Sequence, residues 1–310
     1  MKIIEPSVEL LRTGLEKEFM RPEQFIEKVG RTCYKSEDKI TDDSAAKFVS
    51  NLIKRGHEAM IEHWSLIFTM SGDTMSQIQY DWNTIGIKPH LRFTDYARYV
   101  VSGNMRAWRD FANDLLSKFG FIPNYMHGMI LNYPMFFPEY QDYVPKYIGG
   151  IILKPIDISD LTNRERLVHQ DITVKFICDR GVSHELVRHR VASFAQESTR
   201  YCNYGDDKFG NEITVIRPSW CGKHSDLYKR WFEGCLSSEC AYLTLLAEGA
   251  TPQQARAVLP NSLKTEVIMT MNLAGWNHFF ILRRAKGAHP DMQEVAGMAH
   301  ELFGEIYGDE

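Results

Sequence analysis

The sequence lacks several features that mark other classes of protein. Its six cysteines include no C-x-x-C pair, which argues against a structural zinc site and predicts reduced thiols. The pairs His57-Glu58 and His184-Glu185 both lack the second histidine of the H-E-x-x-H zinc motif, so we expect no bound metal. No G-x-G-x-x-G segment occurs, which excludes a dinucleotide site on a Rossmann turn.

Long apolar runs and a strong net charge are also missing. No segment is apolar enough to span a bilayer, and the acidic first residues do not resemble a signal peptide, so we expect a cytoplasmic protein without a membrane partner. A formal charge of −4 argues against a surface that binds nucleic acid throughout. Any anion site must therefore consist of a few placed arginines.

What is present is an ordinary globular composition, with 44% hydrophobic and 25% charged residues among 310. Apolar periodicity predicts helices and strands in the following ranges: helices over 22–29, 43–54, 104–119, 226–248, 273–284 and 290–307, and strands over 64–70, 97–101, 171–178 and 263–272. Ser183 is expected to cap a short helix to Arg190, and Thr251 to open another with a capping box. The strands are too dispersed for a doubly wound sheet, so we predict an α+β fold.

The densest chemical signal is the segment 188–201, RHRVASFAQESTRY. Three arginines and a histidine crowd the end of the predicted short helix and the loop that follows it. Arg188 and Arg190 cannot share one helix face, and the hydroxyls of Ser193, Ser198 and Thr199 suit phosphate oxygens. The segment predicts an anion site, although solvated cations at a helix C-terminus would have the same composition.

This segment resembles the signature of flavin-dependent thymidylate synthases, R-H-R, seven residues, serine, one residue and R-Y. Residues 56–63, GHEAMIEH, are similar to the early G-H-x-x-x-x-E-H segment of that family, and residues 255–260, ARAVLP, to its A-R-x-x-L-P segment. Asn272 and Leu282-Arg283 follow at family-like spacing. The resemblance covers most of residues 30–70 and 171–305, and residues 71–170 look like an insertion into a single domain of residues 1–310.

The resemblance implies a mixed or antiparallel central sheet flanked by helices, and an enzyme that methylates dUMP to dTMP. It implies FAD as cofactor, NADPH and 5,10-methylenetetrahydrofolate as co-substrates, and a homotetramer with shared active sites. Arg283 and Ser198 would be catalytic. The dUMP contacts would be Glu185, Arg188, Gln196, Glu197, Ser198, Thr199, Arg200, Arg256 and Arg283. The FAD contacts would be His57, Ala59, Arg188, His189, Arg190, Gln196, Asn272, Ala274 and His278.

Some positions depart from the family pattern. Some members have an acid at Gln196, glutamine at Glu185, a hydroxyl at Ala59, arginine at Ala274 and asparagine at His278. Cys202 is the nearest candidate for a covalent nucleophile, but the family does not depend on one. Arginine cannot act as a base, so Arg283 would stabilise the negative charge that develops on uracil, and the flavin would carry hydride.

Structural alternatives exist for several of these residues. Arg256 would also suit the polar face of a helix, Arg283 a basic last turn, and Asn272 a helix N-cap. His57 could be a packed, hydrogen-bonded histidine, and Ser198 could bond backbone amides. Two other functions remain open: a nucleotide-binding module without catalysis, and an RNA-binding protein that uses the basic, aromatic segment 92–108.

Overall fold

The computed structural model describes the chain except residues 17–19, 86–88, 146–151, 224 and 308–310. At its centre lies a four-stranded antiparallel sheet whose strands are, in spatial order, β2 (Ser7–Arg12), β7 (Asp171–Asp179), β10 (Lys264–Asn272) and β8 (Ser193–Gln196). Successive side chains of a strand face opposite sides. Ile172, Val174 and Phe176 therefore share one apolar face, while Lys175 points to the other.

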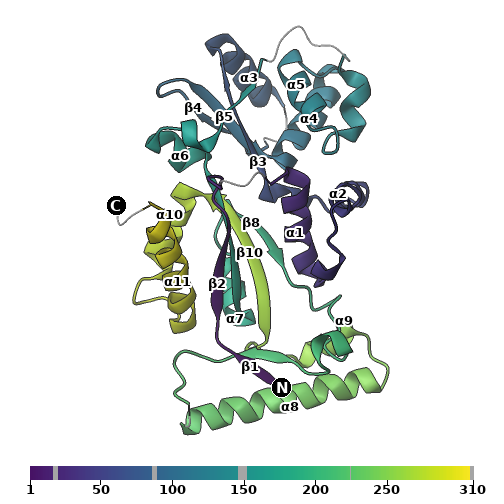
Figure 1. Ribbon diagram of the computed structural model, residues 1–310, viewed down its shortest axis with the longest axis vertical. Helices are drawn as coiled ribbons and strands as arrows, with labels where there is room; N and C mark the ends of the chain where they lie inside the picture. The colour runs from purple at the N-terminus through teal and green to yellow at the C-terminus, as the bar shows by residue number, and fades with distance from the viewer. Residues whose placement is uncertain (17–19, 86–88, 146–151, 224, 308–310) are drawn as a thin grey trace.

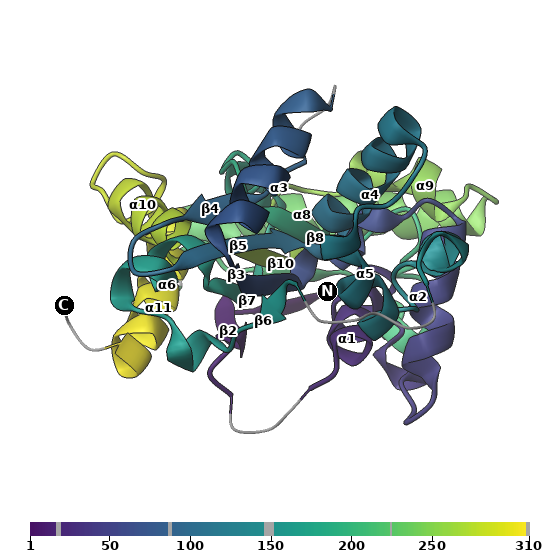
Figure 2. The same cartoon turned by 90° about the horizontal axis from the view of Figure 1, so that it is seen from above.

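Helices cover both faces of this central sheet (Figure 1 and Figure 2). The apolar side packs against α7 (Arg180–Leu186), α10 (Leu273–Arg283) and α11 (Pro290–Tyr307), with Trp276 and Phe279 fully buried between them. The opposite side receives α1 (Pro22–Tyr34), whose Phe25 and Val29 contact Ile268 of β10 and Ala195 of β8.

A second four-stranded antiparallel sheet lies above the first (Figure 1). Its strands are, in spatial order, β4 (Arg92–Thr94), β5 (Tyr99–Asn104), β3 (Ser65–Met70) and β6 (Lys154–Pro155). The helices that accompany it are α2 (Ser44–Lys54), α3 (Gly72–Thr84), α4 (Met105–Phe119), α5 (Asn124–Asn132) and α6 (Asn163–His169). Trp108, Phe111 and Phe137 are fully buried in its aromatic core.

The opposite end of the molecule holds a parallel pair, β1 (Lys2–Ile4) with β9 (Thr214–Ile216), and the long helix α8 (Asp226–Ala247). A one-turn helix, α9 (Pro252–Ala255), packs against α8. The 3-10 turns are η1 (Glu37–Lys39), η2 (Glu58–His63), η3 (Pro138–Tyr143), η4 (Ile158–Asp160), η5 (Asp207–Phe209) and η6 (Arg256–Val258).

Most of the predicted elements are confirmed, as is the α+β class with antiparallel sheets. Asn104 caps α4 by accepting from the Ala107 amide, and Thr251 forms the predicted capping box. The prediction for Ser183 was wrong: Asp179 caps α7 by accepting from the Val182 amide at 2.7 Å, and α7 ends at Leu186, short of Arg190. Asp179, the last residue of β7, is the cap because it stands directly before α7 and its carboxylate reaches the third residue beyond it.

Other differences concern elements that periodicity alone does not define. Residues 193–196, expected in a loop, form β8, because pairing with β10 satisfies their backbone groups. The strand expected over 97–101 begins at Tyr99 and ends at Asn104.

No helix in the described part of the chain is long and apolar enough to cross a membrane. The described residues also contain no group of three or more metal-ligating side chains.

Candidate active site

The turn after α7 presents the R-H-R cluster. Because α7 ends at Leu186, residues 187–190 form an open corner instead of a helical stripe. Arg188 and Arg190 are exposed, and neither guanidinium has a hydrogen-bond or ion-pair partner among the described residues. His189 between them is turned inward and is 8% exposed. The corner therefore offers two free cations on either side of a buried imidazole.

Arg283, at the last position of α10, reaches this corner. Its Nη1 donates to Glu185 Oε2 at 2.7 Å, its Nη2 to the Glu185 carbonyl at 3.0 Å, and its Nε to His189 Nε2 at 2.7 Å. A guanidinium has five N–H donors. Three are used here, which leaves one N–H on each terminal nitrogen for a ligand.

The charge state of His189 follows from these contacts. Burial, together with the nearby charges of Arg283 and His278, lowers its pKa to about 4. The imidazole is therefore neutral at neutral pH. Because its Nε2 accepts from Arg283, the ring proton is on Nδ1. Phe279 packs at a ring distance of 4.9 Å and fixes the ring plane.

Gln196 connects the corner to the central sheet. Its Nε2 donates to Ser183 Oγ of α7 at 3.0 Å and to Thr265 Oγ1 of β10 at 3.2 Å. Ser183 is fully buried, so this amide ties the last residue of β8 to the helix that carries Glu185. The amide oxygen of Gln196 has no partner among the described residues.

The loop after β8 brings further polar groups together. The Ser198 amide donates to the Cys33 carbonyl at 3.0 Å, and the Ser198 hydroxyl accepts from the Arg200 amide at 3.3 Å. Arg256, exposed in η6, lies over this loop with Nη1 at 3.5 Å from Thr199 Oγ1. Arg200 is exposed and stands 5.7 Å from the Tyr201 ring. The loop and η6 thus present two exposed guanidinium groups, those of Arg200 and Arg256, and Arg256 lies beside the Thr199 hydroxyl.

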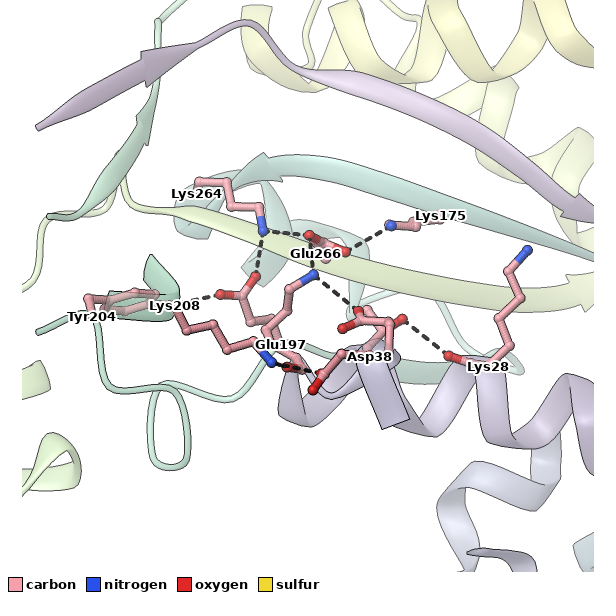
Figure 3. A network of polar contacts seen from close by, with 11 residues as sticks. Lys28, Asp38, Lys175, Glu197, Tyr204, Lys208, Lys264 and Glu266 are labelled. Carbon is pink, nitrogen blue, oxygen red and sulfur yellow. Dashed lines mark hydrogen bonds and ion pairs between the residues drawn. The ribbon is translucent and has the colours of Figure 1, made fainter. Parts of the chain in front are cut away.

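Glu197 is turned into the protein, where Figure 3 shows it beside Lys264 and Tyr204. It is 2% exposed, and its carboxylate accepts from Lys264 Nζ at 2.8 Å and from the Tyr204 hydroxyl at 3.0 Å. Lys264, Tyr204 and their neighbour Glu266 were not singled out from the sequence. The sequence pattern that could have indicated Lys264 and Glu266 is the presence of two charged residues in strand β10, both on the face toward α1.

The remaining predicted flavin residues lie at the surface or in capping positions. Asn272 is the N-cap of α10: its Oδ1 accepts from the Gly275 amide at 2.9 Å, and its Nδ2 donates to the Val168 carbonyl at 3.1 Å. Ala274 and His278 are exposed on α10. His57 and Ala59 are exposed around η2, which packs against β8 and α4, and no described contact joins them to the R-H-R corner.

A cavity of about 830 Å³ lies between the two sheets. Asn272 and Ser193 line it from the central sheet, and Arg92, Arg106 and Asp110 line it from the second layer, which comprises the second sheet and its helices α2 to α6. Sequence reasoning did not anticipate it, because the two walls are far apart in the chain.

The arginines of segment 92–108 are paired with acids. Arg92 makes a bidentate contact with Asp171 at 2.6 and 2.7 Å, Arg98 pairs with Glu165, and Arg106 with Glu62. These charges are neutralised within the protein, which weakens the RNA-binding alternative.

Cys202 follows the loop but faces the interior. Its thiol belongs to a residue that is 1% exposed, and burial raises its pKa to about 12. A thiolate is the reactive form, so the environment does not activate this cysteine.

Comparison with known protein families identifies relatives of this chain. The family model described as "Thymidylate synthase complementing protein" matches residues 15–79 and 163–307, which is more than half of the chain. A flavin-dependent thymidylate synthase of Pyrococcus horikoshii is 39% identical over 119 residues, covering 38% of this chain and 48% of that protein. The enzyme of the same name from Geobacter sulfurreducens is 35% identical over 129 residues, covering 42% of this chain and 53% of that protein.

The chain thus matches about half the length of these curated relatives. Among solved structures, the UMP/dUMP methylase PolB of Streptomyces cacaoi, bound with 5-Br dUMP, is 14% identical with a TM-score of 0.41, covering 99% of this chain and 93% of that one.

Proposed function

The chain belongs to the thymidylate synthase complementing protein family, and from this premise we propose that it is a flavin-dependent thymidylate synthase. It would convert dUMP to dTMP with FAD, NADPH and 5,10-methylenetetrahydrofolate. The observation that carries the proposal is the contact of Arg283 with both Glu185 and His189. Three positions that the family resemblance assigns to the site, with Glu185 and His189 lying 98 and 94 residues from Arg283, meet at one guanidinium.

Arg283 would act on the uracil ring of dUMP. Methylation requires C5 to become nucleophilic, so negative charge develops on the ring oxygens and N3. A guanidinium remains protonated, and its two unused N–H groups can stabilise that charge without reorganisation, because Glu185 and His189 already hold it in place. Glu185 holds the Arg283 cation in place, but its own negative charge repels the negative charge that develops on the ring.

The Ser198–Arg200 loop with Arg256 would hold the phosphate. Arginine forks match phosphate oxygens in geometry and charge, and the Ser198 hydroxyl adds a further donor. Arg256 and Arg200 are both exposed, so a ligand can reach them without displacing protein contacts other than the 3.5 Å contact with Thr199. Gln196 has a free amide oxygen for the base.

The residues available for FAD fit a cofactor with a pyrophosphate. Arg188 and Arg190 are exposed and unpaired among the described residues, which suits two adjacent phosphates, and neutral His189 can donate through Nδ1. Ala274, His278, His57 and Ala59 would contact it from exposed positions, and Asn272 through its remaining amide hydrogen. When bound, the flavin would supply hydride transfer, which no side chain can perform.

Shared active sites in a homotetramer form part of the proposal. Val191, Ile281 and Leu282 flank the site and are 61%, 73% and 47% exposed, a concentration of apolar surface typical of a subunit interface. Sedimentation should give a mass near four 35.9 kDa chains. A monomer that binds flavin and turns over dUMP would contradict this part.

We also propose that residues 71–170 are an insertion into a single enzyme domain with the family's fold. They supply most of the second sheet and its helices, while the family match resumes at residue 163. A cytoplasmic location would keep the six free thiols reduced.

The proposal is tested by reconstitution and turnover. Purified protein should be yellow or should take up FAD, and dTMP should form only when dUMP, NADPH and methylenetetrahydrofolate are all present. Folded protein that stays colourless in excess FAD would exclude the flavin enzyme. Flavin and dUMP binding without turnover would favour a nucleotide-binding module instead.

A further inference from the structure

A cluster of buried charges surrounds Glu266 and includes Glu197, the residue directly before the Ser198–Arg200 loop (Figure 3). Glu266 of β10 is its centre: Lys35 approaches Oε1 at 2.7 Å, Lys264 approaches the same oxygen at 2.5 Å, and Lys175 approaches Oε2 at 2.9 Å. The Glu266 side chain is 6% exposed, and the three lysine side chains are between 14% and 20% exposed. The cluster is therefore largely withdrawn from water.

Glu197 joins this cluster to the loop. Lys264 bridges the two glutamates, at 2.8 Å from Glu197 and 2.5 Å from Glu266. The Glu197 amide also donates to the Glu266 carbonyl at 2.9 Å, and the Tyr204 hydroxyl donates to Glu197 Oε1 at 3.0 Å. The residue directly before Ser198 is thus held through its backbone and through both carboxylate oxygens.

Helix α1 holds the other side of the loop. The Ser198 amide donates to the carbonyl of Cys33, and Lys35, two residues further along, reaches Glu266. Lys35 adopts a left-handed conformation with φ of 48°, and its amide bonds the Arg31 and Thr32 carbonyls. A non-glycine residue in this region persists only where its surroundings fix it.

The charges of the cluster balance. Glu37 pairs with Lys35 at 3.1 Å, so Lys35, Lys175 and Lys264 face Glu37, Glu197 and Glu266. Burial alone would raise the pKa of Glu266, but Lys264 and Lys35 lower it to about 2, so the carboxylate is charged at neutral pH. Because its charges cancel, the cluster exerts little electrostatic attraction or repulsion on a distant ligand. Its effect is to fix positions, since each buried charge is held in place by its ion-pair partners.

Resting on the proposed function, we propose that Lys35, Lys264, Glu266, Glu197 and Tyr204 are positioning residues for the phosphate loop. They do not touch the nucleotide: they fix the backbone from which Ser198 and Arg200 reach it. Glu197, which the family resemblance places among the dUMP contacts, then acts through the loop, since both of its oxygens are engaged inside the protein.

Two variants test the cluster. Tyr204→Phe removes one hydrogen bond to Glu197 and leaves the buried charges, and Lys264→Met removes the bridging cation. Because the loop holds phosphate equally before and during the reaction, we expect dUMP to bind about tenfold more weakly, while turnover at saturating dUMP changes less than about threefold. Lys264→Arg, which keeps the charge, should restore part of the affinity.

The matched control is Arg98→Met. It breaks the Arg98–Glu165 pair, in which Glu165 is fully buried, within the second layer. We expect a comparable loss of thermal stability and unchanged dUMP affinity. If Lys264→Met also loses stability but binds dUMP as wild type does, the cluster is only structural and the proposal is overturned.

Hydrogen exchange on the ligand-free protein separates this inference from the proposed function. Amides of the segment 197–202 should exchange at least about tenfold faster in Tyr204→Phe and Lys264→Met, and at the wild-type rate in Arg98→Met. Unchanged exchange in all three variants would overturn the positioning role. Wild-type protein that is folded but does not bind dUMP would overturn the proposed function instead, and the exchange experiment would still decide the role of the cluster.

Discussion

The second layer and the R-H-R corner use the same residue types in opposite ways. In the second layer Arg92, Arg98 and Arg106 each pair with a carboxylate, and the aromatic side chains of Trp108 and Phe111 are fully buried in the core. At the corner the arginines of the R-H-R segment are exposed, without a partner among the described residues.

The difference separates charges that stabilise a fold from charges that remain available for a ligand. A paired guanidinium has its charge neutralised by a carboxylate and attracts little else, whereas an exposed, unpaired one near a neutral histidine can bind phosphate. Arg283 is intermediate, because it is held by Glu185 and His189 yet keeps two free donors.

Removing an aromatic side chain from the second layer should have the largest effect on stability. Trp108 is fully buried and packs edge-on against Phe68 at a ring distance of 5.6 Å. We expect Trp108→Ala to lower the free energy of unfolding by about 3–5 kcal/mol. Phe121→Ala, at a position 58% exposed in the same layer, should change it by less than about 0.5 kcal/mol. Equal urea midpoints for both variants would show that this cluster is not the core of the layer.

At the corner, Arg283→Ala should reduce catalysis instead of stability. Loss of a preorganised cation should lower the rate of dTMP formation at saturating substrates by about a hundredfold. Affinity for dUMP should fall less, because the charge on the ring is largest in the transition state. The control is Arg284→Ala, the exposed neighbour, which should behave as wild type. Normal turnover by a tetrameric Arg283→Ala variant would show that Arg283 does not stabilise the transition state and is only a basic residue in the last turn of α10.

Acid should destabilise the junction of the two layers through His169. This fully buried ring bonds Ser102 through Nδ1 and Thr94 through Nε2, and burial lowers its pKa from 6.5 to about 4. Between these values the unfolded chain binds a proton that the folded chain does not, so stability falls as pH falls from 6.5 toward 4. His169→Gln should flatten the pH dependence of the unfolding free energy by up to about 1.4 kcal/mol per pH unit. An unchanged slope in urea titrations at pH 6.5, 5.5 and 4.5 would exclude this contribution.

Arg256→Ala should separate binding from catalysis. If this guanidinium holds phosphate, ground state and transition state lose similar binding energy, so dUMP affinity should fall about tenfold with little change at saturation. Calorimetric titration of dUMP measures the first quantity, and dTMP formation the second. Arg230→Ala, on α8 with a side chain 82% exposed, should change neither. A defect in Arg256→Ala that persists at saturating dUMP would assign it a role in the chemical step.

The smallest effect is expected for Cys202→Ala. The thiol is buried and its pKa is raised to about 12, so it should not act as a nucleophile, and activity should stay within about threefold of wild type. Ser198→Ala should lose more. Complete loss of activity in the cysteine variant, with folding and dUMP affinity intact, would mean that the chemistry is covalent.

Local features were predictable from the sequence because they depend on neighbours along the chain. The alternation of β7 and β10, the cap at Asn104 and the capping box at Thr251 all follow from side chains within four residues of one another. β2 and β8 were missed because pairing with β7 and β10 defines them more than their own composition does.

The candidate site divides in the same way. The R-H-R cluster, the family motifs and the lack of metal and Rossmann patterns could be predicted from the chain alone, since each is a matter of residue type and spacing. That Arg283 meets Glu185 and His189, and that Glu197 faces inward to Lys264 and Tyr204, became clear from the folded structure. The physical reason is that such contacts join segments up to 98 residues apart, and the packing of helices and sheets, not the local sequence, determines which side chains meet.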